Sequence, residues 1–243
     1  MMEKIRNSFF CIFIMLAACD SNVETLDGSN PVALSKDPKV LIESAKDKQR
    51  IGAYDEAIEI LNAAVIIDPK FISAFNRMGL VYFEADKKNE SVEAFKKAIA
   101  IDPENLNSRL GLGKTYSMIT RNDLAVEQYL KAAKIKPNDL DILFKIALEY
   151  WYHQNLEQSK EYYNKVLEID PSHIQTHLNL ISVYESLEDW KKAIREIEIS
   201  RQLGKEKNDS TAISIAERKK KFIIGRMNLT EEEYQRKTLP PFD

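Results

Sequence analysis

Four prolines divide the middle of this chain into equal parts. Pro69, Pro103, Pro137 and Pro171 are each 34 residues from the next, and each follows Ile-Asp or Ile-Lys. Proline lacks a backbone N–H and disfavours helix in the residue before it, so it ends one helix and lets another begin. A fixed period of this length indicates stacked, repeated helical units.

Small and large residues recur at fixed places within each period. Ten residues after the prolines stand Gly79, Gly113, Ala147 and Ile181, and a tyrosine follows each of them three residues later. Further along each period, a small residue is followed four residues later by a large one and seven residues later by another small or medium-sized one. The first position holds Ala57, Ser91, Ala125, Ser159 and Ala193. The second holds Leu61, Phe95, Tyr129, Tyr163 and Ile197, and the third holds Ala64, Ala98, Ala132, Val166 and Ser200. Spacings of three, four and seven place residues on one helical face. Each period is therefore expected to hold two helices with matching faces.

This pattern resembles the tetratricopeptide repeat family. The resemblance covers five repeats: 38–71, 72–105, 106–139, 140–173 and 174–207. It implies an all-α fold, a right-handed superhelical solenoid of helix-turn-helix repeats with a concave groove. The outer repeats depart from the pattern, since Lys48 replaces an aromatic residue and Ile181 a small one. Terminal repeats are expected to be atypical because one side of each faces solvent.

Residues 208–243 are expected to form a capping helix and a tail. Gly204 is a candidate helix C-cap, and Asp209 or Ser210 can start a further helix through about Ile223. The residues expected to cover the end of the stack are Ile213, Ile215, Ala216, Phe222 and Ile223. Residues 224–243 are expected to be peripheral, with a short helix after Thr230 and an irregular end.

The first residues have the pattern of a secretory signal. Lys4 and Arg6 precede an apolar stretch that ends at Cys19, and this stretch is too short for a bilayer-spanning helix. Residues 16–19, Leu-Ala-Ala-Cys, resemble the lipobox of bacterial lipoproteins. That resemblance implies removal of residues 1–18 and a lipid on Cys19. Residues 20–36 are polar and contain Asp27-Gly28 and Asn30-Pro31, so residues 19–37 are expected to hold the lipidated cysteine and a flexible tether. An ordinary signal peptide, or an uncleaved anchor with an incidental cysteine, is the alternative.

A lipid on Cys19 implies a membrane-anchored protein of the bacterial cell envelope. Asp20 resembles a signal that retains lipoproteins at the inner membrane of enteric bacteria, but that rule is not general. The inner and outer membranes, and the periplasmic and outer faces, therefore all stay open.

Charge and cysteine content exclude several functions. The formal net charge is −3, whereas nucleic-acid binders normally present a basic face. Loss of Cys11 with the signal and lipidation of Cys19 would leave no thiol for a disulfide or for catalysis. We expect no nucleic acid, no cofactor and no small-molecule substrate.

In the tetratricopeptide family the first helix of each repeat lines the groove. The matching positions give the candidate peptide-binding residues Asn76, Leu80, Phe83, Leu110, Lys114, Phe144, Leu148, Trp151, Tyr152 and Leu178. The fourth repeat is aromatic there, and binding surfaces favour aromatic residues. We therefore expect a protein or peptide partner. Plain packing, or covering by the chain's own tether or tail, is the alternative.

Other motifs point less clearly to chemistry. His173 and His177 are four residues apart, as helical metal ligands can be, but a third ligand is missing nearby. Residues 111–114, Gly-Leu-Gly-Lys, match a phosphate loop poorly and fall inside an expected helix. Lys46 and Asn76 match only part of the chaperone-binding clamp of some relatives. Arg218 to Lys221 are expected to form a solvated helix face rather than a lipid-headgroup contact.

The sequence thus predicts a membrane-anchored, non-catalytic scaffold or adaptor, similar to the tetratricopeptide lipoproteins that help to assemble envelope machines. Two alternatives remain: a surface-exposed lipoprotein that binds external molecules, and an enzyme or small-ligand carrier on the same scaffold.

Overall fold

A computed structural model describes residues 35–238 of the chain. Residues 1–34, with Cys11, Cys19 and the lipobox, lie outside the described residues, as do residues 239–243. The predictions of a signal peptide, a lipidated cysteine and an irregular C-terminal end therefore stay predictions.

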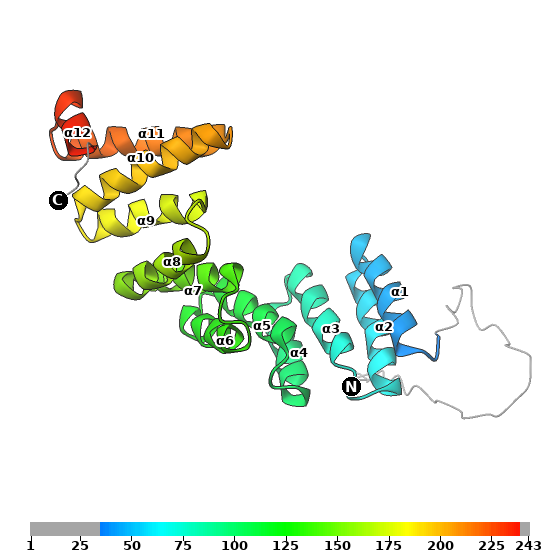
Figure 1. Ribbon diagram of the computed structural model, residues 1–243. Coiled ribbons are helices and arrows are strands. Elements are labelled where there is room, and N and C mark those ends of the chain that lie inside the picture. Colours follow the sequence, from blue (N-terminus) through cyan, green and yellow to red (C-terminus); the bar gives the residue numbers. More distant parts are fainter. Residues whose placement is uncertain (1–34, 239–243) are drawn as a thin grey trace, which may run out of the picture. The chain divides into compact units, whose positions relative to one another are not determined.

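The described part of the chain consists of helices joined by short loops (Figure 1). They are α1 (Pro38–Arg50), α2 (Tyr54–Ile67), α3 (Ile72–Glu84), α4 (Lys88–Ile101), α5 (Leu106–Met118), α6 (Asn122–Ile135), α7 (Leu140–Tyr152), α8 (Leu156–Ile169), α9 (Ile174–Ser186), α10 (Trp190–Glu206), α11 (Ser210–Arg226) and α12 (Glu231–Thr238). The first helices of the five pairs begin at residues 38, 72, 106, 140 and 174, where the predicted repeats begin.

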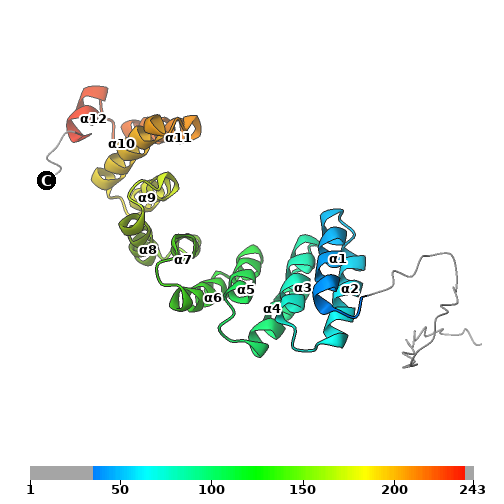
Figure 2. The same cartoon turned by 45° about the vertical axis from the view of Figure 1, so that its right-hand side comes forward.

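Each helix packs against its neighbours in sequence. The two helices of a pair contact each other, and the second helix also contacts the first helix of the next pair (Figure 2). In the described residues the chain is all-helical, and the predicted solenoid of helix pairs is confirmed.

The loops between pairs contain the four prolines. In three of these loops the aspartate before the proline accepts a hydrogen bond from the backbone two residues on. Asp68 Oδ1 accepts from Lys70 N at 2.9 Å, Asp102 from Glu104 N at 3.0 Å and Asp170 from Ser172 N at 2.9 Å. This side-chain turn and the proline together end one pair and start the next.

The turns within pairs share one backbone feature. Each contains a residue with positive φ: Gly52 at 77°, Asp86 at 61°, Thr120 at 58°, Gln154 at 59° and Glu188 at 56°. These residues are 34 apart, and glycine stands at only the first position. A non-glycine residue in this left-handed region costs roughly 1 kcal/mol. The packing of the two helices therefore imposes the turn geometry, whatever residue stands there.

Close contacts between first and second helices depend on glycine. The Phe95 ring of α4 lies 2.7 Å from where a Cβ on Gly79 of α3 would be, and 2.3 Å from a Cβ on Gly111 of α5. Tyr129 of α6 approaches the Cβ position of Gly113 to 2.7 Å. Real Cβ atoms do not tolerate such distances, so glycine lets the aromatic ring fill the space between helices.

In the fifth pair, two isoleucines replace the combination of a small residue and an aromatic ring. Ile181 stands in the small position and Ile197 in the large one, and both are fully buried in one cluster. A larger residue on α9 is thus matched by a smaller one on α10. This exchange conserves volume, which is the kind of change that cores tolerate best.

The end of the stack differs from the sequence-based prediction at Gly204. This glycine was predicted to end a helix, but it lies inside α10, which continues to Glu206. A Cβ on Gly204 would be 2.9 Å from Ile213 Cγ1, so the glycine serves close packing of α11 rather than termination. The helix start was predicted correctly: Asp209 Oδ1 accepts from Ala212 N at 2.9 Å and caps α11.

Most of residues 224–236 are exposed, as expected, and the short helix expected after Thr230 is α12, but one side chain of α12 is part of the core. Tyr234 of α12 is fully buried, and its hydroxyl donates to Glu198 Oε1 on α10 at 3.2 Å. Lys220 lies over the Tyr234 ring, 4.8 Å from its centroid, and pairs with Glu231. Phe222, by contrast, is 53% exposed and does not cover the stack, because Ile223 presents the buried face.

No helix within residues 35–238 is both long enough and apolar enough to cross a membrane.

The glycine contacts give a stability prediction. Gly113→Ala is expected to destabilise the protein because overpacking costs about 1–3 kcal/mol, more than the roughly 1 kcal/mol that alanine gains in a helix. Gly225→Ala is the matched control, since a Cβ there meets nothing within 4 Å. Thermal unfolding followed by circular dichroism measures both, and an unchanged or raised midpoint for Gly113→Ala would contradict the packing argument.

Candidate functional site

The first helices of four pairs form a pocket of about 690 Å³. It is lined by Lys39, Ile42, Glu43, Lys46, Phe71, Ser73, Asn76, Arg77, Leu80, Asn107, Leu110, Gly111, Lys114 and Lys145. We call it the basic pocket. Of the predicted groove residues, Asn76, Leu80, Leu110 and Lys114 meet here.

Positive charge dominates the basic pocket. Five of its lining residues are lysine or arginine, and its one acid, Glu43, pairs with Lys46 at 2.6 Å. Among residues 35–238, Lys39, Lys114 and Lys145 form no ion pair with a carboxylate. Arg77 Nη1 donates to Gln49 Oε1 at 3.2 Å, whereas Arg77 Nε is buried without a partner in the described structure. The pocket is therefore suited to an anionic ligand.

Asn76 is held in place by the next helix pair. Ser108 Oγ donates to Asn76 Oδ1 at 2.6 Å, and Asn76 Nδ2 donates to Asn105 Oδ1 at 3.2 Å. These hydrogen bonds join α3 to the start of α5. Asn76 thus positions the pocket wall, and its amide is already largely satisfied.

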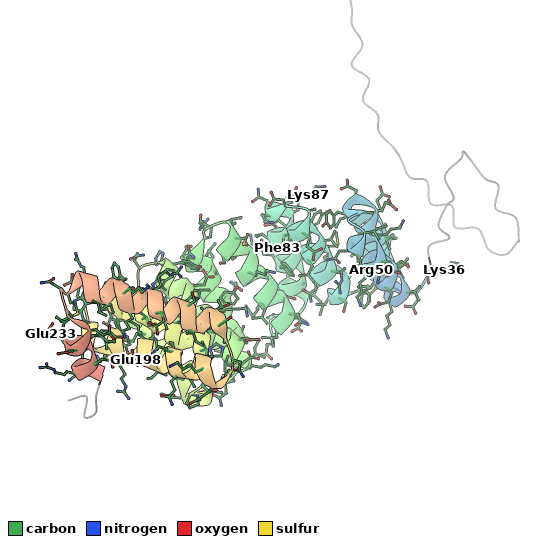
Figure 3. All side chains as sticks on the ribbon, turned by 90° about the horizontal axis from the view of Figure 1, so that it is seen from above. Lys36, Arg50, Phe83, Lys87, Glu198 and Glu233 are labelled. Carbon is green, nitrogen blue, oxygen red and sulfur yellow. The ribbon has the colours of Figure 1, made fainter. Side chains whose placement is uncertain are left out.

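Phe83 has a different environment from the one predicted. Two ammonium groups lie over its ring, Lys88 Nζ at 4.3 Å and Lys114 Nζ at 4.6 Å from the centroid. Figure 3 shows Phe83 close to Lys87, the residue that precedes α4. Cations are attracted to the face of an aromatic ring. Phe83 therefore fixes two positive charges and lines neither pocket of the first helices.

A second pocket, of about 300 Å³, lies between α7 and α9. Its lining is Phe144, Leu148, Trp151, Tyr152, Gln175, Asn179 and Ser182, none of which is charged. We call it the aromatic pocket. Trp151 and Tyr152 have ring centroids 5.1 Å apart, and Tyr152 is 54% exposed. The four predicted residues of the fourth repeat thus come together on one surface.

Phe144 and Trp151 also belong to the protein's own packing. The Phe144 ring lies 5.7 Å from Tyr163 and 5.4 Å from His173, between centroids. Both Phe144 and Trp151 are partly buried against the core of the C-terminal pairs. Substituting them would disturb the fold together with the pocket, so Tyr152 is the better residue for testing binding.

Leu178 was predicted in the groove and is a core residue instead. It is only 7% exposed and packs in one cluster with Ala212 and Ala216 of α11. The reason is that α9 is contacted by α11 as well as by α10. Gln175, Asn179 and Ser182 face the pocket in its place.

Two family models described as tetratricopeptide repeat match residues 72–105 and 140–173. These ranges are the second and fourth helix pairs. The chain is a tetratricopeptide repeat protein. Its repeats build a scaffold suited to protein–protein interaction. No curated protein sequence matches the chain.

Solved tetratricopeptide structures share the fold. A crystal structure of MamA protein is 20% identical, with a TM-score of 0.65, over 71% of this chain and 94% of that one. MamA from Desulfovibrio magneticus RS-1 is 18% identical, with a TM-score of 0.64, over 73% of this chain and 99% of that one. YrrB, described as a tetratricopeptide protein with an unusual peptide-binding site, is 20% identical with a TM-score of 0.62, over 75% of this chain and 93% of that one.

Sequence reasoning missed a pocket of about 780 Å³ on the second helices of the repeats. Leu130, Tyr162 and Ile169 of α6 and α8 line it together with Pro137 and Leu143. The available signal was the isoleucine before each Asp-Pro or Lys-Pro pair. Ile169, one of these isoleucines, lines the pocket and is 44% exposed.

The motifs set aside in the sequence have structural roles. The glycines of residues 111–114 lie within α5 under Phe95 and Tyr129. Of the basic run in α11, Lys219 pairs with Glu185 at 2.5 Å and Lys220 with Glu231, whereas Arg218 and Lys221 are exposed.

The two neighbouring histidines of the fifth repeat have separate partners. His173 caps α9, its Nδ1 accepting from Thr176 N at 3.3 Å. His177 is buried, with Nδ1 2.6 Å from Glu196 Oε2 and Nε2 2.9 Å from Pro171 O. In the described residues, no three His, Cys, Asp or Glu side chains are grouped as metal ligands would be.

The contacts of His177 favour its charged form. Both partners only accept hydrogen bonds, so both ring nitrogens can donate only when the ring is protonated. Burial on its own lowers the pKa of His177, but the hydrogen bonds to Glu196 and to Pro171, with the Glu196 charge, outweigh it and raise the pKa above 6.5.

This pair predicts pH-dependent stability. A histidine with a raised pKa stabilises the fold fully below its unfolded-state pKa, and that contribution disappears as the pH rises through the folded-state value. The difference in unfolding free energy between wild type and His177→Gln should therefore be largest near pH 6 and shrink towards pH 8.5. Urea unfolding at several pH values measures it, and a constant difference would argue against a charged His177.

Proposed function

We propose that this protein is a non-catalytic adaptor that binds a segment of a partner protein along its first helices. The observation that supports this most is that the basic and aromatic pockets both open on α7, which contributes Lys145 to one and Leu148, Trp151 and Tyr152 to the other. One extended segment that crosses α7 would contact both.

The chemistry of the two pockets agrees with a peptide ligand. The basic pocket mixes aliphatic side chains, amides and charges, and the aromatic pocket offers two adjacent rings with one of them largely exposed. Exposed aromatic residues in hollows are frequent centres of binding energy. YrrB, which has the same fold, is described as holding a peptide-binding site.

We further propose that a lipid on Cys19 anchors the adaptor in a bacterial membrane, where it acts in the cell envelope. The support is the signal-like start of the chain and the lipobox-like residues 16–19. Residues 20–37 would then connect the lipid to α1 and let the repeats reach a partner near the membrane.

Photo-cross-linking tests the binding surface. A photoreactive phenylalanine analogue at Tyr152 is expected to form an adduct with a specific protein in intact cells. The same analogue at Phe222 is the matched control, since these two aromatic side chains are 54% and 53% exposed. The adduct should appear only at Tyr152. Equal adducts at both positions, or none at Tyr152, would contradict binding by the first helices.

The two cysteines test the anchor. Cys19→Ala is expected to abolish lipid attachment and leave the protein unprocessed or released from membranes, because residues 16–19 contain no other thiol. Cys11→Ala keeps Cys19 and should remain anchored and processed. Membrane fractionation and the mass of the mature protein measure both variants. Normal lipidation of Cys19→Ala would refute the lipobox assignment.

A further inference from the structure

The unpaired cations of the basic pocket come from successive repeats. Lys39 lies on α1, Arg77 on α3, Lys114 on α5 and Lys145 on α7. Each of the first four repeats thus contributes one positive charge to the same hollow. Glu43 does not offset them, because Lys46 already binds it at 2.6 Å.

This arrangement contrasts with the second helices of the same repeats. There several lysines form ion pairs with glutamates three or four residues earlier: Lys96 with Glu93 at 2.9 Å, Lys160 with Glu157 at 2.5 Å and Lys165 with Glu161 at 2.6 Å. The whole chain has a net charge of −3. In the described residues single unpaired lysines also occur elsewhere, such as Lys97 on α4 and Lys134 on α6, but the basic pocket gathers four unpaired cations with one acid that is already paired.

The surroundings of the four cations indicate what kind of anion fits. Ile42, Leu80 and Leu110 line the pocket together with the cations, and Phe71 is its one aromatic residue. A single-stranded nucleic acid would instead stack successive bases on several aromatic side chains. Arg77 contributes a guanidinium to the lining, and a guanidinium donates readily to carboxylates. Aliphatic side chains alternating with cations suit a peptide that alternates carboxylates with apolar groups.

We propose that the occupant of the basic pocket is an acidic segment of the partner protein, with carboxylates facing Lys39, Arg77, Lys114 and Lys145 in turn. An apolar or aromatic residue of the same segment enters the uncharged aromatic pocket. This inference rests on the proposed function and adds the chemistry of the partner. Unlike a purely apolar contact, such binding weakens with salt, because ions screen charges over about 10 Å at 0.1 M.

Fluorescence anisotropy with synthetic peptides tests the proposal on the full chain in detergent. The probes are a labelled twelve-residue peptide of alternating glutamate and leucine, ending in tyrosine, and the same peptide with glutamine for glutamate. We expect the glutamate peptide to bind at least tenfold more tightly at low salt and to lose that advantage in 0.5 M NaCl. Equal binding of the two peptides would overturn the proposal.

Charge reversal identifies the site. Lys114→Glu with Lys145→Glu is expected to weaken glutamate-peptide binding at least tenfold. Lys96→Glu with Lys160→Glu changes the net charge equally on the second helices and should leave binding unchanged. Lys114→Gln with Lys145→Gln should give an intermediate loss, and circular dichroism verifies folding of each variant. Equal losses in the two reversed variants would overturn the assignment to this pocket.

The same binding assay distinguishes two other possible occupants of the basic pocket, a nucleic acid and the chain's own N-terminal segment. If a single-stranded oligonucleotide of equal charge displaces the peptide equally well, the pocket binds any polyanion and the proposal fails. If the peptide binds only after Asp20, Glu24 and Asp27 are neutralised, the chain's own N-terminal segment is the occupant, which also overturns it. A Tyr152 adduct whose cross-linked segment is not acidic would overturn this inference while leaving the adaptor function intact.

Discussion

The contact between an aromatic ring and a glycine backbone determines how the helices pack in the second and third repeats. Phe95 lies against the Cβ positions of both Gly79 and Gly111, so one ring joins its own helix pair to the next. A single repeat could not bury such a ring, and stability arises from each repeat together with its neighbours. Small and large residues recur at the matching positions of the other repeats, so the first helices stack at regular intervals and bring cations from four repeats into one pocket.

The sequence was sufficient to predict the repeated part of the fold because small residues, large residues and prolines recur with one period. It was insufficient where the period ends. Gly204 looks like a helix terminator but sits inside α10, because only the position of α11 reveals the close approach. Tyr234 is a single apolar residue in a charged stretch, and its burial depends on docking against α10.

The candidate site was predictable in part for the same reason. Family positions placed Leu80, Leu110 and the fourth-repeat aromatics in the lining of the two pockets. They failed for Leu178, since the additional contact with α11 covers α9. Phe83 could not be recognised as a support for two lysines, because Lys88 and Lys114 come from different helices and only the fold brings them over one ring. Contacts between residues of different helices, unlike periodicity and ion pairs three or four residues apart, are not visible along the chain.

The positive-φ turns show how far the repeats are interchangeable. Five different residues adopt one backbone geometry at positions 34 apart, so each helix pair turns in the same way whatever its local sequence. A segment of 34 residues with the same pattern of small and large residues, inserted between residues 105 and 106, would therefore add one more pair and keep the Phe95 type of contact on both sides. Evolution can lengthen the binding surface of such a chain in whole repeats, while both ends keep their own structures.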